Sequence, residues 1–79
     1  MKIQILGTGC PKCKMLEASA RSAVEQMQIT AEVIKVTELD DIMNMGVMMT
    51  PALAIDNDVK SVGKVLTVEQ IVNLIKGVQ

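Results

Sequence analysis

Cys10-Pro11-Lys12-Cys13 joins an alternating apolar run to a stretch with helical periodicity, and it holds the only two cysteines among 79 residues. A disulfide within it would close a loop too short to remove much entropy from the unfolded chain, because that stabilisation grows with loop length. A structural disulfide is therefore not expected. The pair is either redox-active or a metal site, and the rest of the sequence must separate these two possibilities.

The segments on either side of the cysteines predict a strand followed by a helix. Residues 2–6 alternate Ile3 and Ile5 with polar side chains, as a half-buried strand does. Gly7-Thr8-Gly9 ends that strand, and Pro11 suits the first turn of a helix, where the missing N–H has no partner to lose. From Cys13 to about residue 28, one helical face is apolar and the other is a charged, solvated face: Leu16, Ala20, Ala23, Val24 and Met27 against Lys14, Glu17, Arg21 and Glu25.

The remaining residues predict three more strands and two more helices. Strands are expected over residues 31–36, 52–55 and 59–65, with a tight turn at 56–58. A short helix is expected over residues 38–45, and a final helix follows the capping box Thr67-Val68-Glu69-Gln70.

Four features of these later segments carry specific expectations. Thr37 is a candidate N-cap for the short helix, and Gly46 suits its C-terminal end. Its buried side is expected to consist of Leu39, Ile42 and Met43. Gly63, inside the fourth strand, is a candidate β-bulge.

The order of elements is β-α-β-α-β-β-α, which places the chain in the α/β class. The first β-α-β unit is expected to be parallel and right-handed, and the last two strands to form an antiparallel hairpin. A mixed four-stranded sheet with helices on both faces would bury every amphipathic face. We expect one domain over residues 1–79, since a chain of this length holds one core.

Composition excludes several classes of function. The chain has no Phe, Tyr or Trp and a net charge of −1, so nucleic-acid binding is not supported. No apolar run approaches the roughly 18 residues that span a bilayer, so no membrane association is expected. The N-terminus has no apolar leader pattern, and we expect a cytoplasmic protein. In a reducing compartment, a close cysteine pair is more often catalytic or metal-binding than structural.

The position of the two cysteines predicts unequal thiols. Cys10 lies where the helix begins, so unpaired N–H groups and the helix dipole favour its thiolate. Lys12 and Lys14 are expected to add little, as mobile surface charges. We expect the Cys10 pKa to be lowered and Cys13 to be more buried. Cys10 would then attack a substrate disulfide and Cys13 would resolve the mixed disulfide, with Pro11 fixing the backbone between them. The chain has no histidine, which excludes Cys–His chemistry.

Thr50-Pro51 is the second candidate site. Proline at the start of a strand is commonly an ordinary terminator. The alternative is a cis peptide bond, which would turn the Thr50 backbone towards the helix that starts at Cys10. An extended substrate segment could then pair with that backbone as an added strand. The local sequence leaves both alternatives open.

Three segments together carry a resemblance to a known family: residues 7–14, residues 46–53 and residues 62–65. In this order they resemble the thioredoxin-fold superfamily, and within it the small thioredoxin-like or glutaredoxin-like redox-active disulfide proteins. The resemblance implies Cys10 as the attacking thiol, Cys13 as the resolving thiol, and Pro51 as a cis-proline facing them. It also implies sheet order 2-1-3-4 and a third strand antiparallel to the first.

Three positions depart from the pattern of that family, and they affect which partners we expect. Gly9 stands where larger thioredoxins have tryptophan, and Lys12 where glutaredoxins have an aromatic residue. The glutathione contact of glutaredoxins is reduced to Gly63. We therefore expect a monomeric protein-disulfide oxidoreductase without a cofactor, acting on protein disulfides and served by a thiol or flavin-dependent reductase.

Two other functions remain to be weighed. The same cysteines could hold Cu(I), with thioether help from the four methionines between Met43 and Met49. Against this, copper-chaperone domains end in a strand, whereas this chain ends in a helix. A zinc site would need four ligands, and one chain offers two thiols. The third function is a non-catalytic partner-binding domain, in which the cysteine pair would be incidental. Pro11 at the helix start argues against it.

Overall fold

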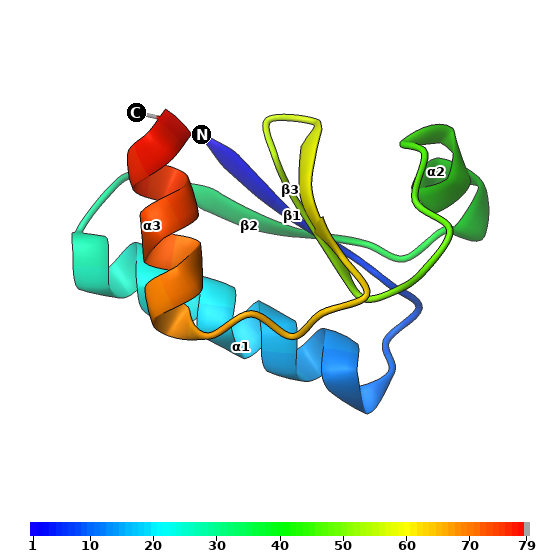
Figure 1. Cartoon of the computed structure of the whole chain (residues 1–79), viewed down its shortest axis with the longest axis horizontal. Helices are drawn as coiled ribbons and strands as arrows, with labels where there is room; N and C mark the ends of the chain where they lie inside the picture. Colours follow the sequence, from blue (N-terminus) through cyan, green and yellow to red (C-terminus); the bar gives the residue numbers. More distant parts are fainter. Residues whose placement is uncertain (79) are drawn as a thin grey trace.

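The computed structural model describes residues 1–78, and it contains four strands and three helices in the expected order (Figure 1). The elements are β1 Lys2–Leu6, α1 Pro11–Met27, β2 Glu32–Val36, α2 Leu39–Asn44, β3 Ala52–Ile55, β4 Asp58–Val62 and α3 Val68–Val78. Each begins and ends close to the residue that the sequence pattern predicts, apart from β4.

The four strands form one mixed sheet in the order β2-β1-β3-β4. β1 pairs with β2 in parallel and with β3 antiparallel, and β3 pairs with β4 antiparallel. Ile3 of β1 stands opposite Val33 on one side and Ile55 on the other. This register aligns the apolar positions of all three strands on one face, and it confirms the α/β fold and the expected sheet order.

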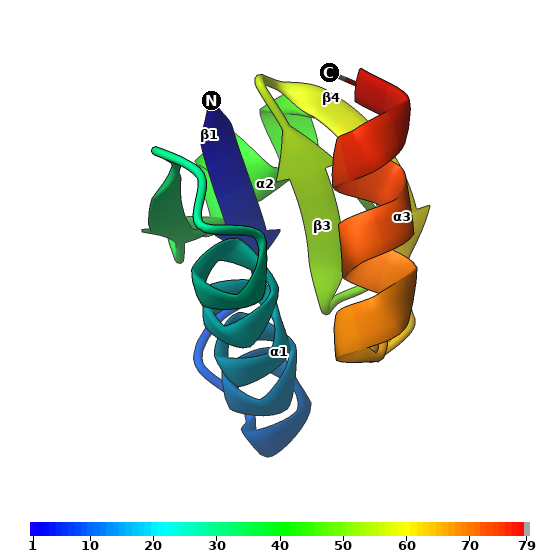
Figure 2. The same cartoon turned by 90° about the vertical axis from the view of Figure 1, so that its left-hand side faces the viewer.

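The sheet separates two hydrophobic clusters of unequal size. α1 and α3 lie on one face (Figures 1 and 2) and bury the larger cluster: Ile3, Ile5, Leu16, Ala20, Ala23, Leu53, Ile55, Leu66, Ile71, Val72 and Ile75. α2 lies against the other face and buries the smaller one: Leu6, Ile42, Val47, Ala52 and Ala54. Both clusters are aliphatic, as the lack of aromatic residues requires.

The N-terminal cap of α3 and the C-terminal end of α2 follow the sequence signals. Thr67 and Gln70 form the expected capping box before α3. The Gln70 N–H donates to Thr67 Oγ1 at 3.1 Å, and the Thr67 N–H donates to Gln70 Oε1 at 2.9 Å. Gly46 follows α2 with φ of +81°, in the left-handed region that glycine reaches without steric cost, and its N–H donates to the Met43 carbonyl.

Two expectations for α2 were wrong. The N-cap is Glu38, not Thr37, and no side-chain hydrogen bond caps this end. Of the three apolar residues expected to be buried only Ile42 is, while Leu39 and Met43 are 60% and 62% exposed. A helix of six residues makes fewer than two turns, so only a narrow strip of it can face the sheet.

The expected bulge at Gly63 was also wrong. β4 ends at Val62, and Gly63 follows it with φ of +73°. The Gly63 N–H donates to the Pro51 carbonyl at 2.8 Å, which ties the end of the hairpin to the start of β3. The register shift lies instead in the middle of the hairpin, between Leu53 and Ala54.

Hydrogen bonds from Gln4 brace the β3–β4 turn. Asp56 and Asn57 have φ of +51° and +70°, the conformation that a two-residue hairpin turn requires. Gln4, only 8% exposed, accepts from the Asn57 N–H through Oε1 and donates to Asn57 Oδ1 through Nε2, both at 2.8 Å. Both the oxygen and the nitrogen of this buried amide therefore have a hydrogen-bond partner.

Candidate functional site

The two cysteines lie at the first turn of α1, directly after the loop that leaves β1. Cys10 is the N-cap residue, with extended backbone, and Pro11 occupies the first helical position. The Cys13 N–H donates to Cys10 Sγ at 3.3 Å, so the sulfur satisfies one of the unpaired donors of the helix start. The Cys10 sulfur therefore faces the backbone N–H groups of the first turn of α1.

The hydrogen bonds around Cys10 stabilise its thiolate. The pKa of Cys10 is lowered, first by a hydrogen bond from the Cys13 side chain and then by the Cys13 backbone N–H. The Lys12 backbone makes a smaller contribution of the same sign. The expected lowering is present, and it comes from Cys13 and the backbone rather than from lysine side-chain charge.

Cys13 has the opposite character. It is 5% exposed, whereas Cys10 is partly exposed. Burial raises the pKa of the Cys13 thiol, and its side-chain hydrogen bond to Cys10 raises it further. One sulfur is therefore reachable and easily ionised, and the other is covered and holds its proton.

The Thr50-Pro51 segment lies beside the buried thiol. The Thr50-Pro51 peptide bond is cis, the isomer that the family resemblance implies. Pro51 is fully buried and Thr50 is exposed. A Cβ added to Gly7 would lie within 4 Å of both the Cys13 sulfur and the Thr50 Cβ. The fold thus brings together three segments that are far apart in the sequence.

Gly7 is a residue of this site that the sequence analysis treated only as a strand breaker. A Cβ at position 7 would overlap the Cys13 sulfur, closer than the 3.0 Å that real Cβ atoms respect. The signal was present as a glycine directly after a strand and six positions before the second cysteine. Its meaning depended on where the Cys13 sulfur points, which local pattern does not give.

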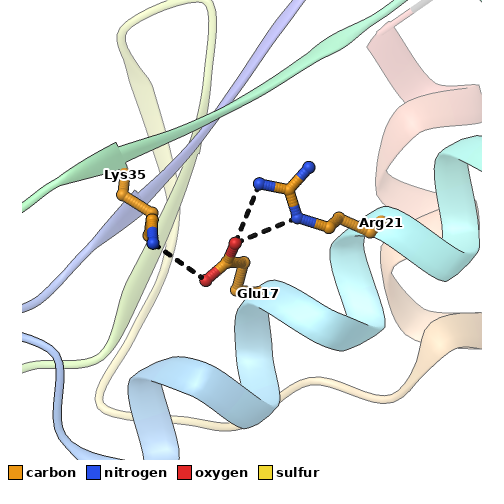
Figure 3. A network of polar contacts seen from close by, with 3 residues as sticks. All are labelled: Glu17, Arg21 and Lys35. Carbon is orange, nitrogen blue, oxygen red and sulfur yellow. Dashed lines mark hydrogen bonds and ion pairs between the residues drawn. The ribbon is translucent and has the colours of Figure 1, made fainter.

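A small cavity opens beside Cys13 on the α1 side of the sheet. It measures about 90 Å³, and Gly7, Cys13, Glu17 and Lys35 are among the residues that line it. Glu17 was expected on a solvated helix face, but its side chain is only 17% exposed. It pairs with Arg21 at 2.8 Å and with Lys35 of β2 at 3.8 Å (Figure 3). The neighbouring strand covers this part of the helix, which the helical pattern alone could not indicate.

A wider groove lies between α2 and the Thr50 segment. It measures about 360 Å³ and is lined by Thr8, Leu39, Ile42, Met43, Val47, Met48 and Thr50. Met48, at its edge, is 96% exposed. An apolar groove with exposed methionines is typical of a surface that accepts varied apolar side chains.

Neither a metal cluster nor a spanning helix is found in the part of the chain that the structure describes. Within residues 1–78, no three His, Cys, Asp or Glu side chains gather as metal ligands would. No helix of those residues has the length and apolar character needed to cross a membrane. Nothing here favours the Cu(I) alternative over thiol chemistry.

Comparison with known proteins gives concordant matches. Residues 1–76 match the family model of the thioredoxin domain. A thioredoxin of Methanothermobacter thermautotrophicus is 48% identical over 71 residues, which cover 90% of this chain and 92% of that protein. A thioredoxin of Methanocaldococcus jannaschii is 42% identical over 69 residues, covering 87% of this chain and 79% of that protein. The family match spans both the cysteine pair and the Thr50-Pro51 segment.

Proposed function

Since the chain belongs to the thioredoxin domain family, we propose that Cys10 is its attacking thiol, Cys13 its resolving thiol, and Thr50 and Pro51 its substrate-binding segment. Family membership together with the Cys10–Cys13 pair makes the protein a thiol–disulfide oxidoreductase. The assignment of roles to the individual residues is our proposal.

The proposed reaction proceeds in two exchanges. The Cys10 thiolate attacks one sulfur of a substrate disulfide, that S–S bond breaks, and its other sulfur leaves as a thiolate. Cys13 then loses its proton and attacks Cys10 Sγ, which releases the first substrate sulfur as a thiolate. The substrate gains two electrons, and the protein retains a Cys10–Cys13 disulfide.

The contrast between the two thiols is the observation that carries the assignment. The reachable sulfur has the lowered pKa and the covered sulfur the raised one. Only a thiolate is an effective nucleophile, so the first attack falls to Cys10. The hydrogen bond from the Cys13 N–H to Cys10 Sγ supports the reach needed for the second step.

The surface formed by Thr50 and the groove next to it supports an extended, partly apolar substrate segment. The loop and turn hydrogen bonds of residues 1–78 include none to the Thr50 backbone, so this exposed residue can pair with an added strand. The neighbouring groove offers apolar contact through Met43 and Met48. We therefore propose protein disulfides as substrates, with one apolar side chain near the target cysteine.

The remaining partners follow from the same chemistry. The Cys10–Cys13 disulfide must be reduced after each turnover, and we propose a thiol or flavin-dependent reductase for this step. Net reduction of protein disulfides suits a reducing compartment, which favours the cytoplasm. We propose that the protein acts as a monomer, since each step uses residues of one chain.

Two cysteine variants test the proposed roles with insulin as the disulfide substrate. Cys10→Ser removes the attacking sulfur and should abolish insulin reduction. Cys13→Ser keeps the attack but not the resolution, so it should accumulate a mixed disulfide that reductant releases. Lys64→Ala, on the loop after β4, serves as a control that should keep wild-type turnover. Wild-type turnover in both cysteine variants would show the assignment to be wrong.

A further inference from the structure

Gly7 is not required by the backbone conformation at its position. Its φ is outside the left-handed region that favours glycine, which Gly9, Gly46 and Gly63 occupy. Its N–H donates to the Val36 carbonyl at 3.0 Å and extends the β1–β2 ladder by one residue. A residue with a side chain could adopt this conformation, so the reason for glycine must lie in the space around it.

That space is filled by the Cys13 side chain. A Cβ at residue 7 would overlap the Cys13 sulfur and lie 3.2 Å from Cys13 Cβ. Cβ atoms built at Gly9, Gly46 and Gly77 would meet nothing within 4 Å. Of the five glycines, Gly7 is therefore the only one whose missing Cβ leaves space that the Cys13 sulfur occupies.

We propose that Gly7 is a positioning residue that makes room for the Cys13 sulfur in the dithiol form, and that it thereby raises the reduction potential of the Cys10–Cys13 couple. The proposal rests on the redox couple of the proposed function. It adds a residue that acts through the Cys13 sulfur.

The physical argument compares the two redox forms. In the dithiol form the two sulfurs are unbonded and must stay at van der Waals separation, and the Cys13 sulfur occupies the space next to Gly7. Formation of the disulfide removes both thiol hydrogens and draws the Cys13 sulfur towards Cys10. A methyl group at residue 7 would therefore crowd the dithiol more than the disulfide.

The effect can be measured as a balanced exchange with dithiothreitol. Reduced dithiothreitol transfers two electrons and two protons to the Cys10–Cys13 disulfide and becomes a cyclic disulfide itself. In Gly7→Ala we expect this equilibrium to shift about tenfold towards the protein disulfide. A tenfold change in a two-electron couple corresponds to about 29.6 mV, here in the more negative direction.

Gly77→Ala provides the matched control, because it adds the same methyl group on α3 where nothing lies within 4 Å. Its exchange equilibrium should equal that of the wild type. A second readout is the thermal unfolding midpoint of each redox form. Gly7→Ala should lower the midpoint of the reduced form more than that of the oxidised form. An unchanged equilibrium, a shift towards the dithiol, or equal lowering of both midpoints would overturn the proposal.

Two further results separate the possible failures. If the wild type shows no reversible exchange with dithiothreitol, the proposed function fails; if only Gly7→Ala matches the wild type, the inference alone fails. If reduced Gly7→Ala does not fold, Cys13→Ala in the same chain removes the overlapping sulfur and should restore folding. Failure to restore it would show that the sulfur is not what Gly7 accommodates.

Discussion

The Cys13 side chain is the largest cause of the lowered pKa of Cys10, and the Cys13 N–H also donates to the Cys10 sulfur at 3.3 Å. The proposed resolving residue thus favours the thiolate of the proposed attacking residue before any substrate binds. Loss of the thiol donor should therefore change the chemistry of its neighbour.

Cys13→Ala should raise the pKa of Cys10 towards that of an ordinary thiol, because it removes the side-chain donor and leaves the backbone donors. At neutral pH the thiolate fraction falls, and alkylation of Cys10 by iodoacetamide becomes slower. The pH dependence of the alkylation rate gives the pKa directly. Cys13→Ser, which keeps an O–H donor, should show a smaller rise. An equal rise in Lys14→Ala would contradict this origin of the shift.

The raised pKa of Cys13 predicts how the stability of the reduced protein depends on pH. A group whose pKa is higher in the folded state contributes stability below its unfolded pKa and loses it as pH rises through the folded value. With Cys10→Ser in both proteins, so that the Cys10 thiolate makes no contribution, the free energy of unfolding should therefore fall relative to Cys13→Ala from neutral to alkaline pH. Urea denaturation of both reduced proteins across that range measures the difference. Parallel curves would show that Cys13 is not buried as a thiol.

Thr67→Ala should destabilise the protein by about 1 kcal/mol, because it removes the side-chain cap of α3. Thr37→Ala is the matched control. Thr37 precedes α2 but does not cap it, so its removal should change the free energy of unfolding by less than about 0.5 kcal/mol. Denaturant titration of the two variants checks both values. Equal losses would mean that Thr37 has a role that the hydrogen bonds do not show.

Gln4→Ala should destabilise the protein by about 1–3 kcal/mol, because the Asn57 N–H and side chain lose their partners at the hairpin turn. Gln26→Ala, on the exposed face of α1, should stay within about 0.5 kcal/mol of the wild type. Both free energies come from urea denaturation of the oxidised form. A loss as small as that of Gln26→Ala would contradict the bracing role of Gln4.

Met43→Glu should weaken reduction of protein disulfides by about tenfold in kcat/KM, mostly through KM. The reason is that burial of a methionine side chain contributes about 1.5 kcal/mol or more. Reduction of a small disulfide such as oxidised glutathione does not use the groove and should keep its rate. Met15→Glu changes a similarly exposed methionine that does not line the groove, and should spare both activities. Equal losses on both substrates would place Met43 outside the substrate surface.

Patterns that depend on near neighbours in the sequence predicted most of the fold. The capping box at Thr67, the proline after Cys10 and the alternation of Ile3 with Ile5 act within one turn or one strand. The capping box and the proline hold in the structure, and the alternation correctly predicts a strand, but Gln4 is buried as well as Ile3 and Ile5, so β1 is covered on both faces. The pair Cys10 and Cys13 was found in the same way, because one helical turn sets their separation.

The errors share a dependence on distant contacts. The helical pattern placed Glu17 on a solvated face, whereas in the structure Lys35 of β2 lies beside it. Leu39 and Met43 fit a buried stripe, but α2 is too short to turn both towards the sheet. The reason for glycine at position 7 depends on where the Cys13 sulfur points. Local propensity does not carry such information, since tertiary packing decides it.

The smaller cluster beneath α2 implies uneven resistance to amide hydrogen exchange. Ile42 and Val47 pack this segment against the sheet, whereas the larger cluster is buried between α1, α3 and the strands. Elements with few buried contacts open at lower free energy than the rest of a domain. Deuterium should therefore enter residues 39–47 well before β1, so we expect the groove between α2 and the Thr50 segment to open more readily than the side of the sheet that α1 and α3 cover.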